Sequence, residues 1–135
     1  MILLDTNICI AAIREHPRVA ARLIQHGGRV CLPFPVVAEL RFGVEKALAK
    51  GQPANEARLR LAAFLLRVPG VLPVTDAVLT LHAKTRAFLE AAGTPIGPND
   101  LWIAAQALAE DALLVTDNTR EFKRVPGLRI ENWLR

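Results

Sequence analysis

The sequence predicts a single α/β domain over residues 1–135, in which a short parallel sheet is flanked by helices. Two observations favour this class. Apolar runs of three or four residues recur along the chain, and longer stretches with the periodicity of amphipathic helices separate them. Short apolar strands that alternate with helices are typical of a parallel sheet covered on both faces. The length of 135 residues suffices for one hydrophobic core, and no change of composition marks a second domain.

The apolar runs predict about four to five strands. The expected strands are Ile2–Leu4, Val30–Leu32, Val71–Val74, Leu113–Thr116 and, at the edge of the sheet, Leu128–Ile130. In sheets of this kind ligands gather at the carboxyl ends of the strands. The residues that follow each strand are therefore the first candidates for a functional site.

Proline, glycine and capping residues delimit the expected helices. Pro17 divides the first helical stretch, Gly27 closes it, and Pro98 begins a later helix. Thr75 is an N-cap, and Gly93 is a natural stop for the helix between them. The expected helices are Asn7–Glu15, Arg18–His26, Val36–Leu48, Ala54–Val68, 76–92, Pro98–Ala109 and Thr119–Lys123.

The composition excludes some classes of protein. The formal net charge of +4 is compatible with a polyanionic partner, although many basic domains bind no nucleic acid. Cys9 and Cys31 are too few and too far apart for a redox pair or a zinc site, so buried, reduced thiols are expected. No apolar run approaches the roughly 20 residues of a membrane span, and the first residues do not resemble a signal peptide. A cytoplasmic protein is expected.

Four acidic residues lie where expected strands end or helices begin. Asp5 and Asp117 each follow a strand, Asp100 lies in the first turn of a helix, and Glu39 lies one turn inside another. Each has a structural explanation of its own, as an N-cap, a turn former, a helix-dipole partner or a solvated helix residue. As a group they indicate more, because converging carboxylates repel one another unless a cation lies between them.

The ligand type of this acidic group indicates its chemistry. Carboxylate oxygens without neighbouring His or Cys suit a hard ion such as Mg²⁺ or Mn²⁺. Such an ion commonly bridges to phosphate oxygens, and a water that it activates can attack phosphorus in line. Surrounding Arg and Lys side chains would hold a polyanion. The sequence therefore suggests metal-assisted hydrolysis of phosphodiester bonds.

Four segments carry motifs in a characteristic order: LLDTN, VVAELRFG, RAFLEAAGTPIGPNDLWIAAQAL and LLVTDNTREFKRVPGLRIENW. Together they resemble PIN-domain ribonucleases, and in particular the VapC-like toxins of toxin–antitoxin pairs. The resemblance implies the PIN-domain fold, with α/β/α layers. It also implies that Asp5, Glu39 and Asp100 hold the divalent ion.

The resemblance implies supporting roles for the neighbours of these acids. Thr6 and Asn7 complete the first motif, and Asn7 is expected to support the ligands by hydrogen bonding. Thr116 matches a hydroxyl found near the site in the family. The fourth acidic position corresponds to Asp117 or Asn118, and Asp117 is assigned a secondary ligand or water-positioning role.

The function that the resemblance implies is that of an endoribonuclease toxin, dependent on Mg²⁺ or Mn²⁺, that cuts structured RNA such as tRNA. A cognate antitoxin and a second toxin subunit are the implied protein partners, in a homodimer and a toxin–antitoxin hetero-oligomer. Phe34, Val36 and Phe42 flank Glu39, and they are expected to form an apolar groove for such a partner.

Aromatic and histidine residues outside the motifs favour structural roles. Trp102 is expected in the core or at a subunit interface, and Trp133 is expected to pin the last segment to the body. His82 is expected to be a surface or partly buried structural residue.

Three other functions fit the sequence less well than the ribonuclease does. A non-catalytic RNA-binding or scaffold domain would gain nothing from acids that face phosphate. A phosphatase that forms an aspartyl-phosphate typically needs a second acid two residues after the first, where this chain has Asn7. Dinucleotide binding is disfavoured because no GxGxxG follows any strand.

Overall fold

The computed structural model describes residues 1–68 and 70–135, and it confirms the α/β class. The described strands are β1 (Ile2–Leu4), β2 (Val30–Cys31), β3 (Leu113–Val115) and β4 (Arg129–Glu131). They form one parallel sheet in the order β2-β1-β3-β4, so β1 has a neighbour on each side. The expected edge strand is confirmed, and it begins one residue later than predicted.

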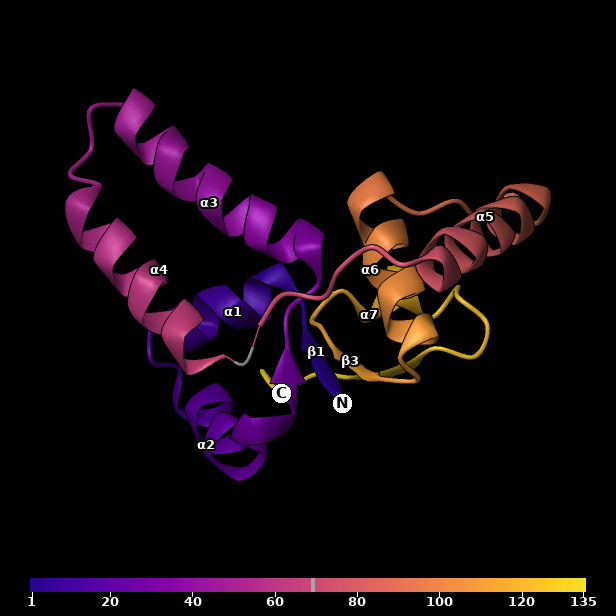
Figure 1. The fold of residues 1–135 in the computed structure, drawn as a ribbon, viewed down its shortest axis with the longest axis horizontal. Coiled ribbons are helices and arrows are strands. Elements are labelled where there is room, and N and C mark those ends of the chain that lie inside the picture. The colour runs from indigo at the N-terminus through magenta and orange to yellow at the C-terminus, as the bar shows by residue number, and fades with distance from the viewer. Residues whose placement is uncertain (69) are drawn as a thin grey trace.

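The helices lie in two groups on either side of the sheet. They are α1 (Thr6–Ile13), α2 (Pro17–His26), α3 (Phe34–Ala49), α4 (Asn55–Arg67), α5 (Asp76–Ala91), α6 (Pro98–Ala109) and α7 (Thr119–Phe122), with a 3₁₀ turn, η1 (Gly27–Arg29). Figure 1 shows α1 to α4 on one side and α5 to α7 on the other, with β1 and β3 between them. This is the expected three-layer arrangement. Within the described ranges, no helix is both long enough and apolar enough to span a membrane.

The predicted strand Val71–Val74 is wrong. Val71 forms only an isolated bridge with Leu32, and the chain then leaves the sheet. The N–H of Leu72 donates to the carbonyl of Leu32 at 2.9 Å. Pro73 follows, and it has no N–H with which to continue a ladder. The apolar run therefore lies beside the sheet without forming a strand.

A buried glutamine on α6 forms hydrogen bonds with backbone groups that this short strand pairing leaves without a partner. The Gln106 Nε2 donates to the carbonyl of Leu72 at 3.1 Å, and its Oε1 accepts from the N–H of Phe34 at 3.0 Å. Phe34 is the first residue of α3, which begins two residues earlier than predicted because Pro35 is tolerated in a first turn. Gln106 thereby fixes the start of the helix that carries Glu39.

The core lies around the central strands. All three residues of β1 are buried, and α6 contributes small buried side chains, such as Ala104 and Ala107, that allow close packing against the sheet. Cys9 is buried and Cys31 half-buried, and both are free thiols, as predicted. Burial raises the pKa of the Cys9 thiol, which keeps it protonated and unreactive.

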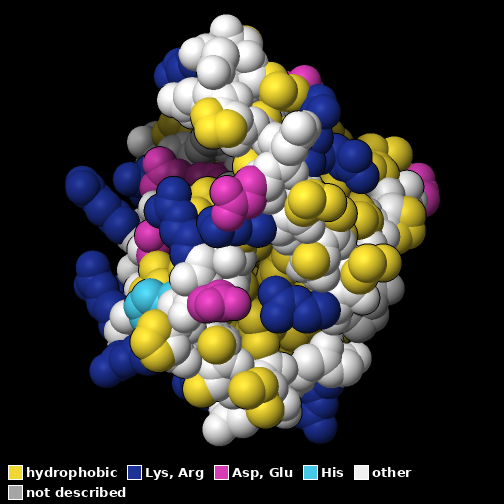
Figure 2. All heavy atoms as spheres, turned by 90° about the vertical axis from the view of Figure 1, so that its left-hand side faces the viewer, with side chains coloured by type: hydrophobic (Ala, Val, Ile, Leu, Met, Phe, Trp, Pro, Cys, Tyr) yellow, Lys and Arg dark blue, Asp and Glu magenta, His cyan; other side chains and the backbone are white. Residues whose placement is uncertain are grey.

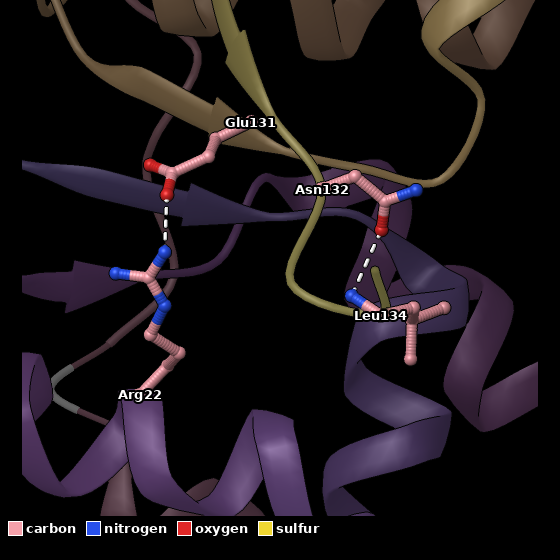
Figure 3. Close-up of polar contacts among 4 residues, drawn as sticks. All are labelled: Arg22, Glu131, Asn132 and Leu134. Carbon is pink, nitrogen blue, oxygen red and sulfur yellow. Dashed lines mark hydrogen bonds and ion pairs between the residues drawn. The ribbon is translucent and has the colours of Figure 1, made fainter.

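The carboxyl end of the chain is held against α2. Trp133 is 2% exposed and stacks on His26 with 5.7 Å between the ring centroids, while the Arg22 guanidinium lies 5.8 Å from the Trp133 ring centre. Arg22 Nη2 also pairs with Glu131 Oε1 at 2.6 Å, as Figure 3 shows. The prediction that Trp133 pins this segment is confirmed.

Candidate active site

The ends of the two central strands bring the first acid and its hydroxyl partner together. Because β1 and β3 are parallel neighbours, the residues that follow them, Asp5 and Thr116, meet at one edge of the sheet. Thr116 Oγ1 donates to Asp5 Oδ2 at 2.7 Å and accepts from the N–H of Asn118 at 2.9 Å. The other oxygen of Asp5 accepts from the N–H of Thr6 at 2.8 Å. These bonds fix the orientation of a carboxylate that is only 7% exposed.

The second group of acids lies between α6 and α7. Asn118 Nδ2 donates to Asp100 Oδ2 at 3.2 Å and to Glu121 Oε2 at 3.1 Å. The carboxyl groups of Asp100 and Glu121 also share a hydrogen bond. Asn118 therefore connects the Asp5–Thr116 pair to Asp100, since its own N–H bonds to Thr116.

Glu121 contacts two residues of the cavity, Asn118 and Asp100, and it was not predicted from the sequence. Asn118 and Glu121 are three residues apart at the start of α7, and this spacing is also that of a capping box. Helix capping would therefore account for both residues even if they belonged to no functional site. In the structure the Asn118 side chain makes no capping bond to α7, and it points to Asp100 instead.

Two further acids are exposed, and each accepts a hydrogen bond from an amide. Asn99 Nδ2 donates to Glu39 Oε1 at 2.9 Å, which joins the first turn of α6 to α3. Asn7 Nδ2 donates to the two oxygens of Asp117 at 3.2 and 3.4 Å. The supporting role predicted for Asn7 agrees with this contact. Asn99 was not predicted, although it lies beside Asp100 in the sequence.

These side chains line one cavity of about 530 Å³ at the carboxyl edge of the sheet. Its lining residues are Asp5, Thr6, Asn7, Glu39, Asn99, Asp100, Ile103, Asp117 and Asn118. The four acids named from the sequence therefore lie together, with Thr116 behind Asp5. Both candidates for the fourth position, Asp117 and Asn118, line the cavity.

The four predicted acids accept hydrogen bonds from neutral donors. Among the residues that the structure describes, none of the four forms an ion pair with Lys, Arg or His. Their donors are the Thr116 hydroxyl, the Thr6 backbone and the amides of Asn7, Asn99 and Asn118. Neutral donors hold a carboxylate in place without cancelling its charge, so the cavity is a concentrated negative region in a basic protein.

The electrostatics of the cavity reflect this concentration of acids. Burial raises the pKa of Asp5, and the charge of Asp117 adds to the effect, while the bonds from Thr116 and Thr6 oppose it. Burial also raises the pKa of Asp100 to about 7, together with the neighbouring Glu121 and Asp5. The hydrogen bond from Asp100 lowers the pKa of Glu121. The two shifts have opposite directions, so Asp100 is the more readily protonated of the two acids.

The apolar groove predicted beside Glu39 has a different lining from the one expected. Val36 is fully buried in the core, so it is unavailable to a partner and that part of the prediction is wrong. Phe42 is 59% exposed, whereas Phe34 is half-buried against Trp102. A groove of about 410 Å³ does extend from Glu39 between α1, α3 and α4. Figure 2 shows Lys and Arg side chains beside hydrophobic ones on this side of the molecule.

The donor set of the cavity fits a hard divalent ion. Within residues 1–68 and 70–135, no three His, Cys, Asp or Glu side chains are grouped closely enough to hold an ion directly. Mg²⁺, however, is commonly bound by one or two carboxylates and keeps several of its waters. Carboxylate and amide oxygens line the cavity, without sulfur or imidazole. Asp5, Glu39 and Asp100 are thus suitable oxygen donors.

Comparisons with known proteins agree with this geometry. Residues 2–128 match the PIN domain. The chain is 40% identical over 134 residues to "Ribonuclease VapC2" of Rickettsia felis, covering 97% of this chain and 96% of the relative. It is 38% identical over 132 residues to "tRNA(fMet)-specific endonuclease VapC" of Shigella flexneri, with the same coverage of the two chains.

Solved structures show the same relationship. The crystal structure of VapBC2 from Rickettsia felis, bound to a DNA fragment from their promoter, contains a chain that matches with a TM-score of 0.88 and 37% identity. The match covers 98% of this chain and 99% of that one. DNA-bound VapBC from Salmonella typhimurium gives a TM-score of 0.88 at 35% identity, covering 98% and 97% of the two chains. The chain thus belongs to the PIN-domain family, within its VapC-like group.

Proposed function

We propose that this chain is an endoribonuclease that hydrolyses phosphodiester bonds of structured RNA, such as tRNA, as the toxin of a toxin–antitoxin pair. The observation that carries the proposal is the cavity in which Asp5, Glu39, Asp100 and Asp117 converge without a cationic partner in the described chain. The relatives named as ribonucleases and as tRNA(fMet)-specific endonuclease support RNA as the substrate. Such a substrate and antitoxin would place the protein in the cytoplasm.

Mg²⁺ or Mn²⁺ is the cofactor of this proposal, and Asp5, Glu39 and Asp100 would hold it, in part through the waters that such an ion keeps. Asp117 would be a secondary ligand or water-positioning group. When bound, such an ion activates a water and offsets the negative charge that develops on the phosphoryl oxygens. The residues of the chain supply the positioning. The Thr116 hydroxyl holds Asp5, and Asn118 holds Asp100, so the carboxylates are oriented before substrate arrives.

Positive charge beside the cavity would hold the RNA strand. The charges of Arg124 and Arg120 both act on Glu121, which places these two side chains near the acidic group. Arg120 is exposed and free to meet phosphate oxygens, whereas Arg124 is half-buried. Basic residues at the rim would draw in a polyanion that the acids alone would repel.

A cognate antitoxin and a second copy of the chain are the proposed protein partners. The VapBC complexes among the similar structures support an antitoxin. The groove that extends from Glu39 would place an antitoxin segment beside the cavity. Exposed hydrophobic side chains support a homodimer, and they include Val74, which precedes α5, and Leu79, which lies on α5.

The test is cleavage of total tRNA by the purified protein with Mg²⁺ or Mn²⁺, with EDTA as the metal-free control. Asp5→Asn and Asp100→Asn should each abolish cleavage. Asp76→Asn is the matched control, because Asp76 also lies in the first turn of a helix, α5, but does not line the cavity. Equal cleavage by the wild type and both site variants would refute the assignment. RNA binding that survives both substitutions, with no cleavage in either metal, would indicate a non-catalytic RNA-binding domain.

A further inference from the structure

A second cavity lies on the other side of the first turn of α6. It has a volume of about 420 Å³ and is formed between α5 and α6. The residues that matter here are His82 and Arg86 of α5, Trp102 of α6 and Pro95 of the connecting segment. Pro98 and Leu101 face this cavity, whereas Asn99 and Asp100 between them face the acidic one. The two cavities are therefore separated by less than one helical turn along α6.

A column of three rings lies beside this cavity, and two of them, Trp102 and His82, line it. The Trp102 ring lies 5.8 Å from Phe34, edge to face, and stacks on His82 with 3.7 Å between centroids and 20° between the planes. In the described part of the chain, no other aromatic ring contacts the His82 imidazole. Burial and the charge of Arg86 lower the pKa of His82, so the ring is neutral at pH 7. The half-buried His82 thus has one face stacked on Trp102 and a second face without an aromatic partner in the described part of the chain.

Two arginines provide positive charge around this cavity. Arg86 lies one turn after His82, and its Nε bonds to Glu90 at 3.0 Å. The two terminal nitrogens of Arg86 form no hydrogen bond within residues 1–68 and 70–135. Arg124 Nη1 donates to the carbonyl of Pro95 at 2.9 Å, and its charge also acts on Glu121. Arg124 thus connects the rim of the ring-lined cavity to the acidic site.

We propose that this cavity is a subsite for one base of the RNA strand, next to the cleaved bond, and that the base stacks on His82. The inference rests on the proposed ribonuclease function. A phosphate in the acidic cavity would leave the adjoining nucleotide at the first turn of α6. Arg124 and Arg86 would then follow its backbone, and the ring column would receive its base. Stacking on an aromatic platform beside a basic track is the usual way to hold single-stranded nucleic acid.

The test measures RNA binding without cleavage, by fluorescence anisotropy of a short fluorescein-labelled single-stranded RNA in EDTA. His82→Ala should weaken binding about tenfold, the typical loss of one stacked base. Arg86→Ala should weaken binding and reduce its salt dependence, since a phosphate contact is lost. Lys84→Ala is the matched control, because Lys84 is an exposed cation of the same helix that does not line the cavity. It should bind like the wild type.

A second series of RNAs, each abasic at one position, identifies the stacked base. At one position the missing base should weaken wild-type binding about tenfold and His82→Ala binding no further, because both changes remove the same contact. Independent losses at every position would overturn the subsite, as would wild-type affinity in both His82→Ala and Arg86→Ala. Arg86 is exposed, so its variant tests the proposal even if His82→Ala does not fold.

Two parallel measurements separate this proposal from the others. If the wild type cleaves RNA with Mg²⁺ but shows no base-specific coupling to His82, the subsite is wrong and the ribonuclease stands. If the coupling is present and no RNA is cleaved, the subsite stands and the ribonuclease is wrong. Sedimentation tests the competing occupant, a second copy of the chain. Variants that become monomeric with unchanged RNA affinity would show that this cavity is an interface between copies, which overturns the subsite.

Discussion

Replacing Asp100 with Asn should make the metal-free protein more stable while abolishing its activity. At pH 8 the Asp100 carboxylate is ionised, half-buried and close to the charges of Glu121 and Asp5. An asparagine has the shape and hydrogen-bonding pattern of the protonated aspartic acid. Its oxygen can accept from Asn118, and its amide can donate to Glu121 in place of the carboxyl proton. The variant keeps the network and loses the repulsion.

The magnitude follows from the pKa of Asp100, which is about 7 in the folded protein against a usual 3.8. Each pKa unit corresponds to about 1.4 kcal/mol, so full conversion would give about 4 kcal/mol. Because the carboxyl is partly exposed and solvent screens its neighbours, we expect a gain of about 1 to 2 kcal/mol. For a chain of this length that is about 3 to 8 °C in Tm.

The sign of the pH dependence is fixed by the same shift. Between pH 4 and 7 the folded state binds the Asp100 proton that the unfolded state has released, so wild-type stability falls as the pH rises through this window. The raised pKa of Asp5 acts in the same direction but is present in both proteins. The difference between wild type and Asp100→Asn therefore isolates Asp100. The gain in stability of Asp100→Asn over the wild type should have its full size at pH 8 and should vanish near pH 4.

The assay is thermal unfolding by circular dichroism in EDTA at several pH values. Asp76→Asn is again the control, and it should not gain stability at pH 8, because Asp76 is exposed and has no acid-lined cavity around it. An Asp100→Asn protein that is no more stable than the wild type at pH 8 would refute the reasoning. So would a gain of equal size at pH 5 and pH 8, since it could not come from ionisation.

Three other predictions follow from the contacts around the site. Thr116→Val removes the hydroxyl donor of Asp5 at nearly constant shape, so cleavage should fall at least about tenfold, whereas Thr116→Ser should retain activity; equal rates would exclude a role for the hydroxyl. Gln106→Leu should lower the free energy of unfolding by about 3 kcal/mol in urea titrations, because buried backbone groups lose their partner; an unchanged midpoint would contradict this. Asn99→Lys should pair with Glu39 and reduce cleavage in a folded protein, while Asn99→Gln should not; full activity in Asn99→Lys would contradict a need for free negative charge.

The parts of the fold that could be predicted from sequence are those set by local pattern. Ile2–Leu4 is fully apolar and ends at an acid, so both the buried strand and the placement of Asp5 at its carboxyl end followed directly. Val71–Val74 has a similar apolar pattern, but Pro73 removes an N–H and Gln106 satisfies the carbonyls instead. That substitution of a side chain for a strand partner depends on tertiary contact. The sequence pattern does not contain it.

The acids of the site were predictable where their position alone was unusual. Asp5 follows a strand, Asp100 lies in the first turn of a helix, and Glu39 lies one turn inside another. Each adjoins an apolar residue, so the sequence indicated them as a group. Glu121 is also part of the group, but its spacing from Asn118 is explained by an ordinary helix start. The two explanations differ only in where the side chain points, and that is fixed by Asp100, 18 residues away from Asn118.

The choice of partners around the acids indicates what the site is for. The chain has 17 Lys and Arg residues, and arginines form ion pairs with acids elsewhere on its surface, as Arg22 does with Glu131. At the cavity, hydroxyl and amide groups take the place of those cations. An arrangement that served stability alone would neutralise the carboxylates. Burial, together with repulsion among these acids, raises the pKa of Asp5 and Asp100 and weakens the fold at neutral pH. Neutral donors keep the geometry and leave the charge uncompensated, which is the state that the proposed divalent ion would need.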